Sequence, residues 1–484
     1  MKAPFPSVLL FLGLTALAPA AAPDWRNETY VSRDAAKARV AGQVARLVVP
    51  EDPAKPDGTK IELALMRLPA TTATPGAPIV YLHGGPGGAG AEHLDNPGFR
   101  ALFAALQTQG DVILFDQRGC GQSKPSFIPH PPPRPEPDLL ASRERLLDFL
   151  ARTSVAVRDR AVQAGHDPHL YTVPQSVADL EAIRRALGAE RIHLFAHSYG
   201  TQLAQAFMRA HPSSVARAVL VGSRGMDTAR KLPAEADAFL GRIAELARAD
   251  ATVGAKFPDL LATFRRVLAK LDAAPVAVEM ECGEKKEPMT FRVGGDALRF
   301  IVAKFYLGDP DNFKYLPKLL DELDTGRRPW SLVFNIGTLL RAPISYTWLT
   351  TDAASGVTAA RAAAIRAQAP TALLREAMNF PFPEINRVWT MSDLGDAFRA
   401  PVRTELPTLF VVGSLDGITP VGQTREIMRT FAAARLLVVE NGGHNSLFRP
   451  AEVPAAIASF YGGRTPPESV RMPPVEFMPL VATR

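Results

Sequence analysis

The chain has 484 residues, 47% of them apolar and 21% charged, and its 55 Lys and Arg against 49 Asp and Glu give a net charge of +6. This composition supports a large folded core of about two or three domains, at roughly 150 residues each, and excludes a disordered or fibrous chain. The basic residues are scattered, which argues against a nucleic-acid partner, and the two cysteines exclude a disulfide scaffold and multi-cysteine zinc sites.

The N-terminus has the pattern of a secretory signal peptide over residues 1–20. Lys2 precedes the apolar run VLLFLGLTAL, and Ala18-Pro19-Ala20 forms a cleavage site. The run is too short to span a bilayer. We therefore expect an exported protein, secreted or periplasmic, that has no membrane contact once the leader is removed.

After the leader, residues 36–70 predict an antiparallel pair of strands, and the chain then changes to alternating strands and helices. Further strands are expected at residues 77–83, 111–119, 191–198, 216–223, 407–416 and 435–444, with helices between them, such as 99–109 and 177–188. These strands are nearly continuous apolar runs, which is typical of a mostly parallel sheet that helices cover on both faces. The fold class is therefore α/β.

Two insertions interrupt this alternation. We divide the chain after the leader into a first core part with a proline-rich insertion, a mainly helical cap that follows the sixth strand, a second core part and a tail. The corresponding ranges are 21–225 for the first core part, 124–170 for its insertion, 226–400 for the cap, 401–462 for the second core part and 463–484 for the tail.

Ser198 is the candidate nucleophile. It lies in Ala196-His197-Ser198-Tyr199-Gly200, where a predicted strand turns into a helix. The pentapeptide matches the nucleophile elbow G-x-S-x-G with alanine in the first glycine place. Such a turn needs small flanking residues and presents the hydroxyl at a helix N-terminus, where developing negative charge is stabilised. A serine at this position can also be an ordinary helix cap.

A glycine-rich loop, His83-Gly84-Gly85-Pro86-Gly87-Gly88, follows an earlier strand. In proteins with this elbow, the equivalent loop supplies one oxyanion donor and the residue after the nucleophile supplies the other. We assign these donors to the amides of Gly85 and Tyr199. The same loop also fits the dinucleotide pattern G-x-G-x-x-G from Gly85, with Asp116 at the end of the next strand, which keeps a nucleotide-binding oxidoreductase open as an alternative.

Asp416 and His444 complete a candidate catalytic triad. Each ends a predicted strand of the second core part, and the order Ser198, Asp416, His444 is the order that hydrolases with this elbow use. His444 is the one histidine of nine that follows Asp416, so the general base has a single candidate. In this chemistry the histidine takes the serine proton, and the aspartate orients the ring and stabilises the imidazolium.

No cofactor or metal is expected, because the sequence contains no H-E-x-x-H pattern or comparable cluster of ligands. Cys120 and Cys282 could pair in an oxidising compartment or remain free. Both possibilities are left open by the sequence.

The motifs HGGPGG, DQRGCGQS, SYG, GSLDGITP and GGH together resemble the α/β-hydrolase serine peptidases, in particular prolyl aminopeptidases and secreted tripeptidyl aminopeptidases. The resemblance covers roughly residues 60–225 and 400–462. It implies the α/β-hydrolase fold, the triad above, and structural roles for Asp116 and Arg118. The sequence departs from these enzymes in Ala196 and in lacking a cysteine beside an acidic residue near the end of the cap.

The resemblance also implies a substrate and a reaction. An aminopeptidase of the prolyl or tripeptidyl type would remove residues from peptide N-termini, and carboxylates of the cap would bind the substrate's ammonium group. The candidates for this contact are Asp352, Glu376 and Glu384. Two other functions remain open: an esterase or lipase-like hydrolase of small acyl esters, and a non-catalytic binding protein on the same fold.

Overall fold

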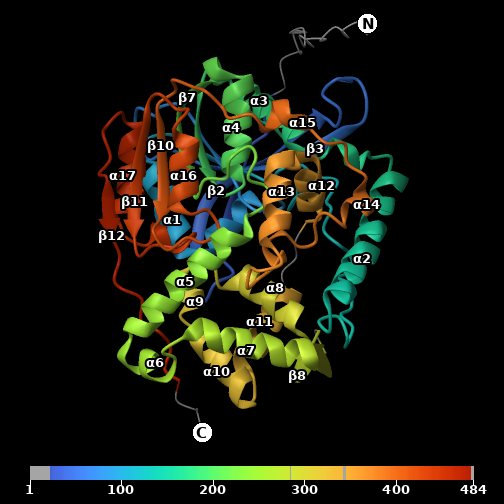
Figure 1. Cartoon of the computed structure of the whole chain (residues 1–484). Coiled ribbons are helices and arrows are strands. Elements are labelled where there is room, and N and C mark those ends of the chain that lie inside the picture. Colours follow the sequence, from blue (N-terminus) through green and yellow to red (C-terminus); the bar gives the residue numbers. More distant parts are fainter. Residues whose placement is uncertain (1–21, 284, 342–344, 481–484) are drawn as a thin grey trace, which may run out of the picture.

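The computed structural model of the chain describes residues 22–283, 285–341 and 345–480. At its centre lies a ten-stranded sheet in the order β1-β2-β3-β5-β4-β6-β7-β10-β11-β12 (Figure 1). The strands are β1 (Arg26–Val31), β2 (Arg39–Pro50), β3 (Lys60–Leu68), β4 (Ile79–Leu82), β5 (Val112–Phe115), β6 (Ile192–His197), β7 (Val215–Val221), β10 (Thr408–Gly413), β11 (Ala434–Glu440) and β12 (Ser469–Arg471).

The sheet is mostly parallel. β1, β2, β3 and β5 pair antiparallel, whereas every neighbouring pair from β5 to β12 is parallel. The α/β class and the mostly parallel sheet are therefore confirmed. β1 and β12 have no counterpart among the predicted elements, because β1 (RNETYV) lacks apolar alternation and β12 has only three residues. The interpreted leader, residues 1–20, lies outside the described residues.

Helices cover both faces of the sheet (Figure 1). Alternate side chains of β4 separate the two layers: Ile79 and Tyr81 lie in the core with α1 and α17, and Val80 and Leu82 lie in the core with α3 and α4. This alternation follows from the strand's two-residue period. The covering helices are α1 (Pro97–Leu106), α3 (Val173–Ala186), α4 (Gly200–Ala210), α16 (Val421–Met428) and α17 (Glu452–Tyr461).

A cap is inserted between β7 and β10 and has its own hydrophobic core. Figure 1 shows α7 and α10 at the end of the molecule away from the sheet. The cap elements are α5 (Pro233–Ala249), α6 (Ala251–Lys256), α7 (Leu260–Ala273), β8 (Val276–Cys282), β9 (Glu287–Val293), α8 (Gly295–Phe305), α9 (Pro310–Phe313), α10 (Leu316–Thr325), α11 (Trp330–Arg341), α12 (Thr347–Ser355), α13 (Ala359–Gln368), α14 (Asn386–Trp389) and α15 (Gly395–Arg399). The antiparallel hairpin β8–β9 has no counterpart among the predicted elements of this region.

The smaller insertion also joins the cap. Its helix α2 (Arg143–Gln163) packs against α14, and the guanidinium of Arg158 donates to the carbonyl of Val388 (2.6 Å). The tail returns to the same core, where Phe477 is buried and the amide of Met478 donates to the carbonyl of Lys314 (3.1 Å). Among the helices of the described residues, none combines the length and hydropathy of a bilayer-spanning segment.

Candidate active site

Ser198 lies on the turn between β6 and α4, at the carboxyl edge of the sheet. Its φ of 54° is in the left-handed region, which residues other than glycine rarely adopt. The Ser198 amide donates to the carbonyl of Val221 at the end of β7 (2.9 Å), and the Thr201 hydroxyl donates to the Ser198 carbonyl (2.6 Å). A strained strand-to-helix turn held on both sides is the local geometry of a nucleophile elbow.

The elbow is tight enough to require small neighbours. A Cβ atom on Gly200 would lie 2.0 Å from the carbonyl oxygen of Leu82, and a Cβ atom on Gly84 would lie 2.9 Å from the Cβ of Ser198. Ala196 is fully buried opposite Leu82 in the sheet. The glycines therefore let α4 begin directly against β4 and let the glycine-rich loop approach Ser198.

Asp416 and His444 are brought together by the loops that follow β10 and β11. The Nδ1 atom of His444 donates to Oδ2 of Asp416 (2.6 Å). The same carboxylate accepts hydrogen bonds from the Thr419 hydroxyl (2.6 Å), the Thr419 amide (2.9 Å) and the Ile418 amide (2.8 Å). This network fixes the aspartate and leaves Nε2 as the free nitrogen of the imidazole.

The electrostatics of the pair favour a charged aspartate and a basic histidine. Burial lowers the pKa of His444, but the charge and hydrogen bond of Asp416 outweigh it, so this pKa lies above its usual value. Burial raises the pKa of Asp416, yet the imidazole and the donors of Thr419 hold it below its usual value. His444 can therefore accept a proton and keep a stabilising partner while it is charged.

Ser198 and His444 both lie against one short segment, Val221-Gly222. Val221 accepts the hydrogen bond from the Ser198 amide, and a Cβ atom on Gly222 would lie 2.9 Å from Cε1 of the His444 ring. The residue before the serine, His197, contacts the same loop, since its Nε2–H donates to the carbonyl of His444 (3.0 Å). Ser198 and His444 thus flank the same two residues.

Three further histidines, His83, His93 and His197, lie in a row that ends at His444, and of the neighbouring pairs the rings of His83 and His93 are stacked. The ring centroids are 4.2 Å apart for His83 and His93, 5.7 Å for His93 and His197, and 4.8 Å for His197 and His444. Burial lowers the pKa of His83 to about 4 and that of His197 to about 3. These neighbours stay neutral, which agrees with packing roles for them.

Asp309, a residue of the cap, binds the loop of His444. Its sequence context predicts no function for it. Its carboxylate accepts hydrogen bonds from the amides of Asn445 (3.1 Å) and Ser446 (2.8 Å) and from the side-chain amide of Asn445 (2.9 Å). The preceding residue, Gly308, accepts the hydrogen bond from the His444 amide (2.6 Å). The sequence around residue 309 does not predict this contact. The Asp309 carboxylate binds mainly main-chain amides, and such amides are present in every sequence.

The glycine-rich loop passes close to the elbow, and Gly85 has a φ of 110° that only glycine adopts readily. A Cβ atom on Gly88 would collide with the ring of His83, and one on Gly87 would lie 2.7 Å from the carbonyl oxygen of Ser345 in the cap. Within the described residues, the amides of Gly85 and Tyr199 donate no hydrogen bond to the main chain. Their assignment as the donors to an oxyanion stays a prediction.

Asp116 and Arg118 support these loops from inside the protein. Asp116 accepts hydrogen bonds from the amides of Gly90 (2.7 Å) and Gln122 (2.8 Å). The dinucleotide interpretation needs this carboxylate to bind a ribose. In the structure the carboxylate instead accepts hydrogen bonds from main-chain amides. Arg118 forms a buried, two-pronged pair with Asp179 (2.7 and 2.8 Å).

Cys120 and Cys282 are both free, and burial raises the pKa of Cys120 to about 12.

Two of the three cap carboxylates already have arginine partners. Asp352 pairs with Arg224 (2.5 Å) and lies 3.8 Å from Arg230. Glu384 pairs with Arg143 on α2 (2.8 Å). Within the described residues, neither carboxylate forms a hydrogen bond with Ser198, and the part of Asp352 and Glu384 in binding an ammonium group stays a prediction.

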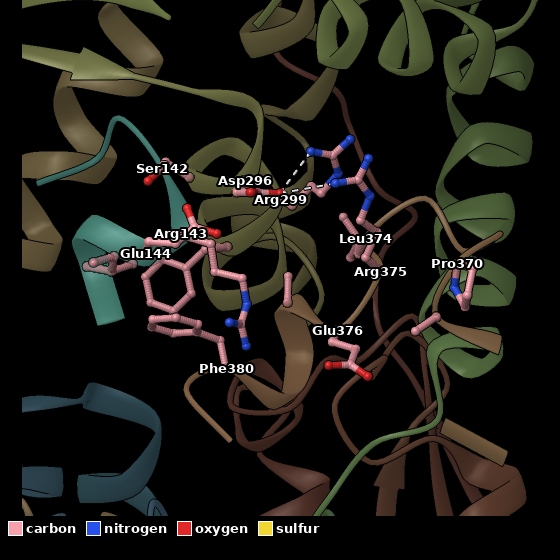
Figure 2. Close-up of a pocket in the computed structure, with 15 residues that line it drawn as sticks. Ser142, Arg143, Glu144, Asp296, Arg299, Pro370, Leu374, Arg375, Glu376 and Phe380 are labelled. Carbon is pink, nitrogen blue, oxygen red and sulfur yellow. Dashed lines mark hydrogen bonds and ion pairs between the residues drawn. The ribbon is translucent and has the colours of Figure 1, made fainter. Parts of the chain in front are cut away.

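Glu376 lines a pocket of about 400 Å³ between the start of α2, α8 and the segment 369–380. Figure 2 shows its carboxylate across the pocket from Arg375 and below Arg143, with no interaction drawn to it. The pocket is lined by Glu376 but by none of Ser198, Asp416 and His444. Its role in the reaction also stays a prediction.

Comparison with known protein families decides the family. A family model described as the alpha/beta hydrolase fold matches residues 77–450. The chain belongs to the α/β-hydrolase fold family. The match runs through the core, the cap and the loop of His444, so this α/β-hydrolase carries its cap as an insertion within one fold.

Several relatives have peptidase names. Serine protease Hip1 of Mycobacterium tuberculosis is 32% identical over 185 residues, 37% of this chain and 35% of the relative. Tripeptidyl aminopeptidase of Streptomyces lividans is 30% identical over 190 residues, 37% of this chain and 34% of the relative. The alignments thus span about a third of each relative. A solved structure of proline iminopeptidase from Mycobacterium smegmatis is 20% identical, covers 86% of this chain and 98% of its own, and has a TM-score of 0.40. Over part of its length, the chain is thus similar to proteins named as peptidases.

Proposed function

We propose that the protein is a serine hydrolase that cleaves peptide or amide bonds near the N-terminus of peptides through an acyl-enzyme on Ser198. The observation that carries the proposal is the hydrogen bond between His444 and Asp416 (2.6 Å), on a loop that also contacts the residue before Ser198. A buried histidine with an aspartate partner, a raised pKa and a neighbouring strained serine is the arrangement that acyl transfer needs.

In the proposed reaction, the Ser198 oxygen attacks the substrate carbonyl while Nε2 of His444 takes the hydroxyl proton. The negative charge that forms on the carbonyl oxygen is stabilised by the amides of Gly85 and Tyr199. His444 then donates the proton to the leaving amine, which gives the acyl-enzyme. A water molecule, deprotonated by His444, attacks the ester, and its proton returns to Ser198 as the acid product leaves.

The peptidase activity and the export are supported by different observations. The names of the relatives above favour peptide substrates, and the segment 1–20 favours export. For the substrate's ammonium group we propose a cap carboxylate, and Glu376 suits it best, because Asp352 and Glu384 have arginine partners. Export is tested by the N-terminal sequence of the mature protein, which the proposal places after Ala20.

A substrate panel tests the proposed activity. It comprises prolyl-, alanyl- and tripeptidyl-arylamides beside short acyl esters, each measured with the wild-type protein and with Ser198→Ala. The proposal expects turnover of at least one arylamide that Ser198→Ala abolishes. Turnover of esters alone would favour an esterase, and turnover of neither, with Ser198 unreactive, would favour a binding protein.

A further inference from the structure

A group of positively charged side chains lies beside the elbow and has no part in the proposed triad. Arg224, Arg230 and Lys231 come from the segment between β7 and α5, which leaves the carboxyl edge of the sheet next to Ser198. We call these three residues the cationic cluster. Arg224 and Arg230 are buried, and Lys231 is half-buried.

The cluster is directly connected to the candidate oxyanion hole. The guanidinium of Arg224 lies over the ring of Tyr199, 5.4 Å from its centre, and Tyr199 is the residue that follows the nucleophile. The guanidinium of Arg230 lies 3.5 Å from the centre of the Phe382 ring, on the cap side. The two arginines therefore lie between the residue that follows Ser198 and residues of the cap.

Within the part of the chain that the structure describes, one carboxylate lies within 4.0 Å of the charged groups of this cluster. Asp352 of α12 accepts from Arg224 (2.5 Å), and its second oxygen is 3.8 Å from Arg230, which also donates to the Asp352 carbonyl (3.0 Å). No carboxylate among the described residues lies within 4.0 Å of the Lys231 ammonium nitrogen. Nε of Arg224 is buried and has no acceptor within the described structure.

Burial and the surrounding charges make Lys231 less basic than an ordinary lysine. The pKa of Lys231 is lowered to about 8, chiefly by burial and also by the charges of Arg224 and Arg361, against the opposite effect of Glu235 and Asp416. The charge of Lys231 in turn lowers the pKa of His444. Lys231 is thus close enough to the candidate base for its charge to act on it.

Burying positive charge without a counter-ion is costly, and proteins seldom keep such charges unless a partner is supplied. Among the described residues, the three cations of the cluster have one carboxylate within 4.0 Å, that of Asp352, while Arg224 keeps an unused donor and Lys231 has no ion pair. An anionic group on the substrate would supply the missing partner. A carboxylate suits the planar guanidinium geometry and is the anion that peptides carry.

We infer that the cationic cluster of Arg224, Arg230 and Lys231 forms a subsite for a carboxylate on the acyl part of the substrate. The inference rests on the proposed acyl-enzyme on Ser198 and specifies its substrate class: peptides with an acidic side chain among the residues on the acyl side of the cleaved bond. The ammonium group, held at the cap, and the acidic side chain would then occupy different parts of the site.

Matched substrates test this subsite. Tripeptidyl-p-nitroanilides of alanine carry Glu or its neutral isostere Gln at the first, second or third position, and kcat/KM is measured for each of the three pairs. We expect the wild-type protein to prefer Glu over Gln at least about tenfold at one position. A wild-type protein with no preference for Glu at any position would overturn the subsite.

Variants attribute the preference to the cluster. Lys231→Met and Arg230→Gln each remove one positive charge, and we expect the Glu/Gln ratio to fall below about threefold in both. Lys318→Met, a half-buried lysine on the cap helix α10, is the matched control and should keep the wild-type ratio. Because the readout is a ratio, a general loss of activity does not mimic the result, and the Tm of each variant reports folding. A ratio that stays unchanged in both cluster variants would contradict the assignment.

The same measurement separates the subsite from the proposed function. If Gln substrates are cleaved as fast as Glu substrates, the amide hydrolase stands and the subsite fails. If no arylamide is cleaved, the subsite is decided by two esters, p-nitrophenyl hydrogen glutarate and p-nitrophenyl pentanoate. Preference for the anionic ester would then support the subsite on an esterase, and equal or absent turnover of both would contradict it.

Discussion

The amide of His444 donates a hydrogen bond to the carbonyl of Gly308, at 2.6 Å, and thereby ties the candidate base to the cap. Gly308 follows α8, whereas His444 follows β11 of the core sheet. The amide of Gly417, next to Asp416, likewise donates to the carbonyl of Leu307 (2.8 Å). The cap therefore supports the loops of both the candidate base and its aspartate.

This connection predicts that Asp309 acts as a positioning residue. Asp309→Ala removes the acceptor for Asn445 and Ser446 and should lower kcat about tenfold or more, since the imidazole loses its fixed position, while KM changes little. Loss of these hydrogen bonds should also reduce the free energy of unfolding by about 1–3 kcal/mol. Steady-state kinetics and urea unfolding measure the two effects.

Asp311→Ala is the control for this variant. Asp311 lies two residues away and pairs with Arg449 at a largely exposed position, where ion pairs contribute little. We expect wild-type kcat for it. Asp309→Asn keeps one acceptor oxygen and should recover part of the lost kcat, whereas equal kcat in all four proteins would contradict a positioning role.

A pair of glycines tests the packing around the imidazole. Gly222 and Gly188 have similar φ angles, 57° and 64°, so alanine strains the backbone at both. At Gly222 the new Cβ would lie 2.9 Å from Cε1 of His444, whereas at Gly188 nothing lies within 4 Å. Gly222→Ala should therefore lower kcat/KM about 100-fold, and Gly188→Ala should reduce stability by roughly 1 kcal/mol with full activity. Similar activity losses in both variants would show that strain alone is responsible.

The pH profile tests the partnership of Asp416 and His444. The aspartate raises the pKa of His444, so kcat/KM should fall as the pH drops through that pKa and the base becomes protonated. Asp416→Asn removes the stabilising charge. The acid limb should then move to lower pH, and kcat should fall by about 10⁴-fold, because the ring loses its orientation. An acid limb that stays in place would mean that another group titrates.

Lys231 predicts a second pH effect that depends on the substrate. Below its pKa of about 8 the ammonium is charged and attracts a carboxylate, and above this pH the attraction is lost. KM for the preferred Glu substrate should therefore rise above about pH 8, whereas KM for its Gln counterpart should stay level. Parallel changes in both KM values would point to a group that does not contact the carboxylate.

The sequence predicts the core and its strand-end residues well for a physical reason. Ser198, Asp416 and His444 each follow an apolar strand and are surrounded by glycine or small residues, and both signals are local in the chain. The parallel pairing of the strands follows from their alternation with helices. These features depend little on distant contacts.

The cap and its contacts are harder to predict, because they depend on tertiary packing. Asp309 binds amides of a loop that lies more than a hundred residues later, and Arg224 differs in no local way from the many scattered arginines of the chain. The hairpin β8–β9 is stabilised by burying Val278 and Phe291 in the cap core, which overrides the helical pattern of its surroundings. Ion pairs such as Arg224 with Asp352 join segments 128 residues apart.

Labelling with a fluorophosphonate probe tests the central claim most directly. The probe reacts with a serine only when a base activates it, and mass spectrometry of the digested protein identifies the modified residue. We expect one adduct, on Ser198, in the wild-type protein and a strongly slowed reaction in His444→Ala. An unlabelled Ser198 in a correctly folded protein, or labelling at an unchanged rate in His444→Ala, would contradict the account.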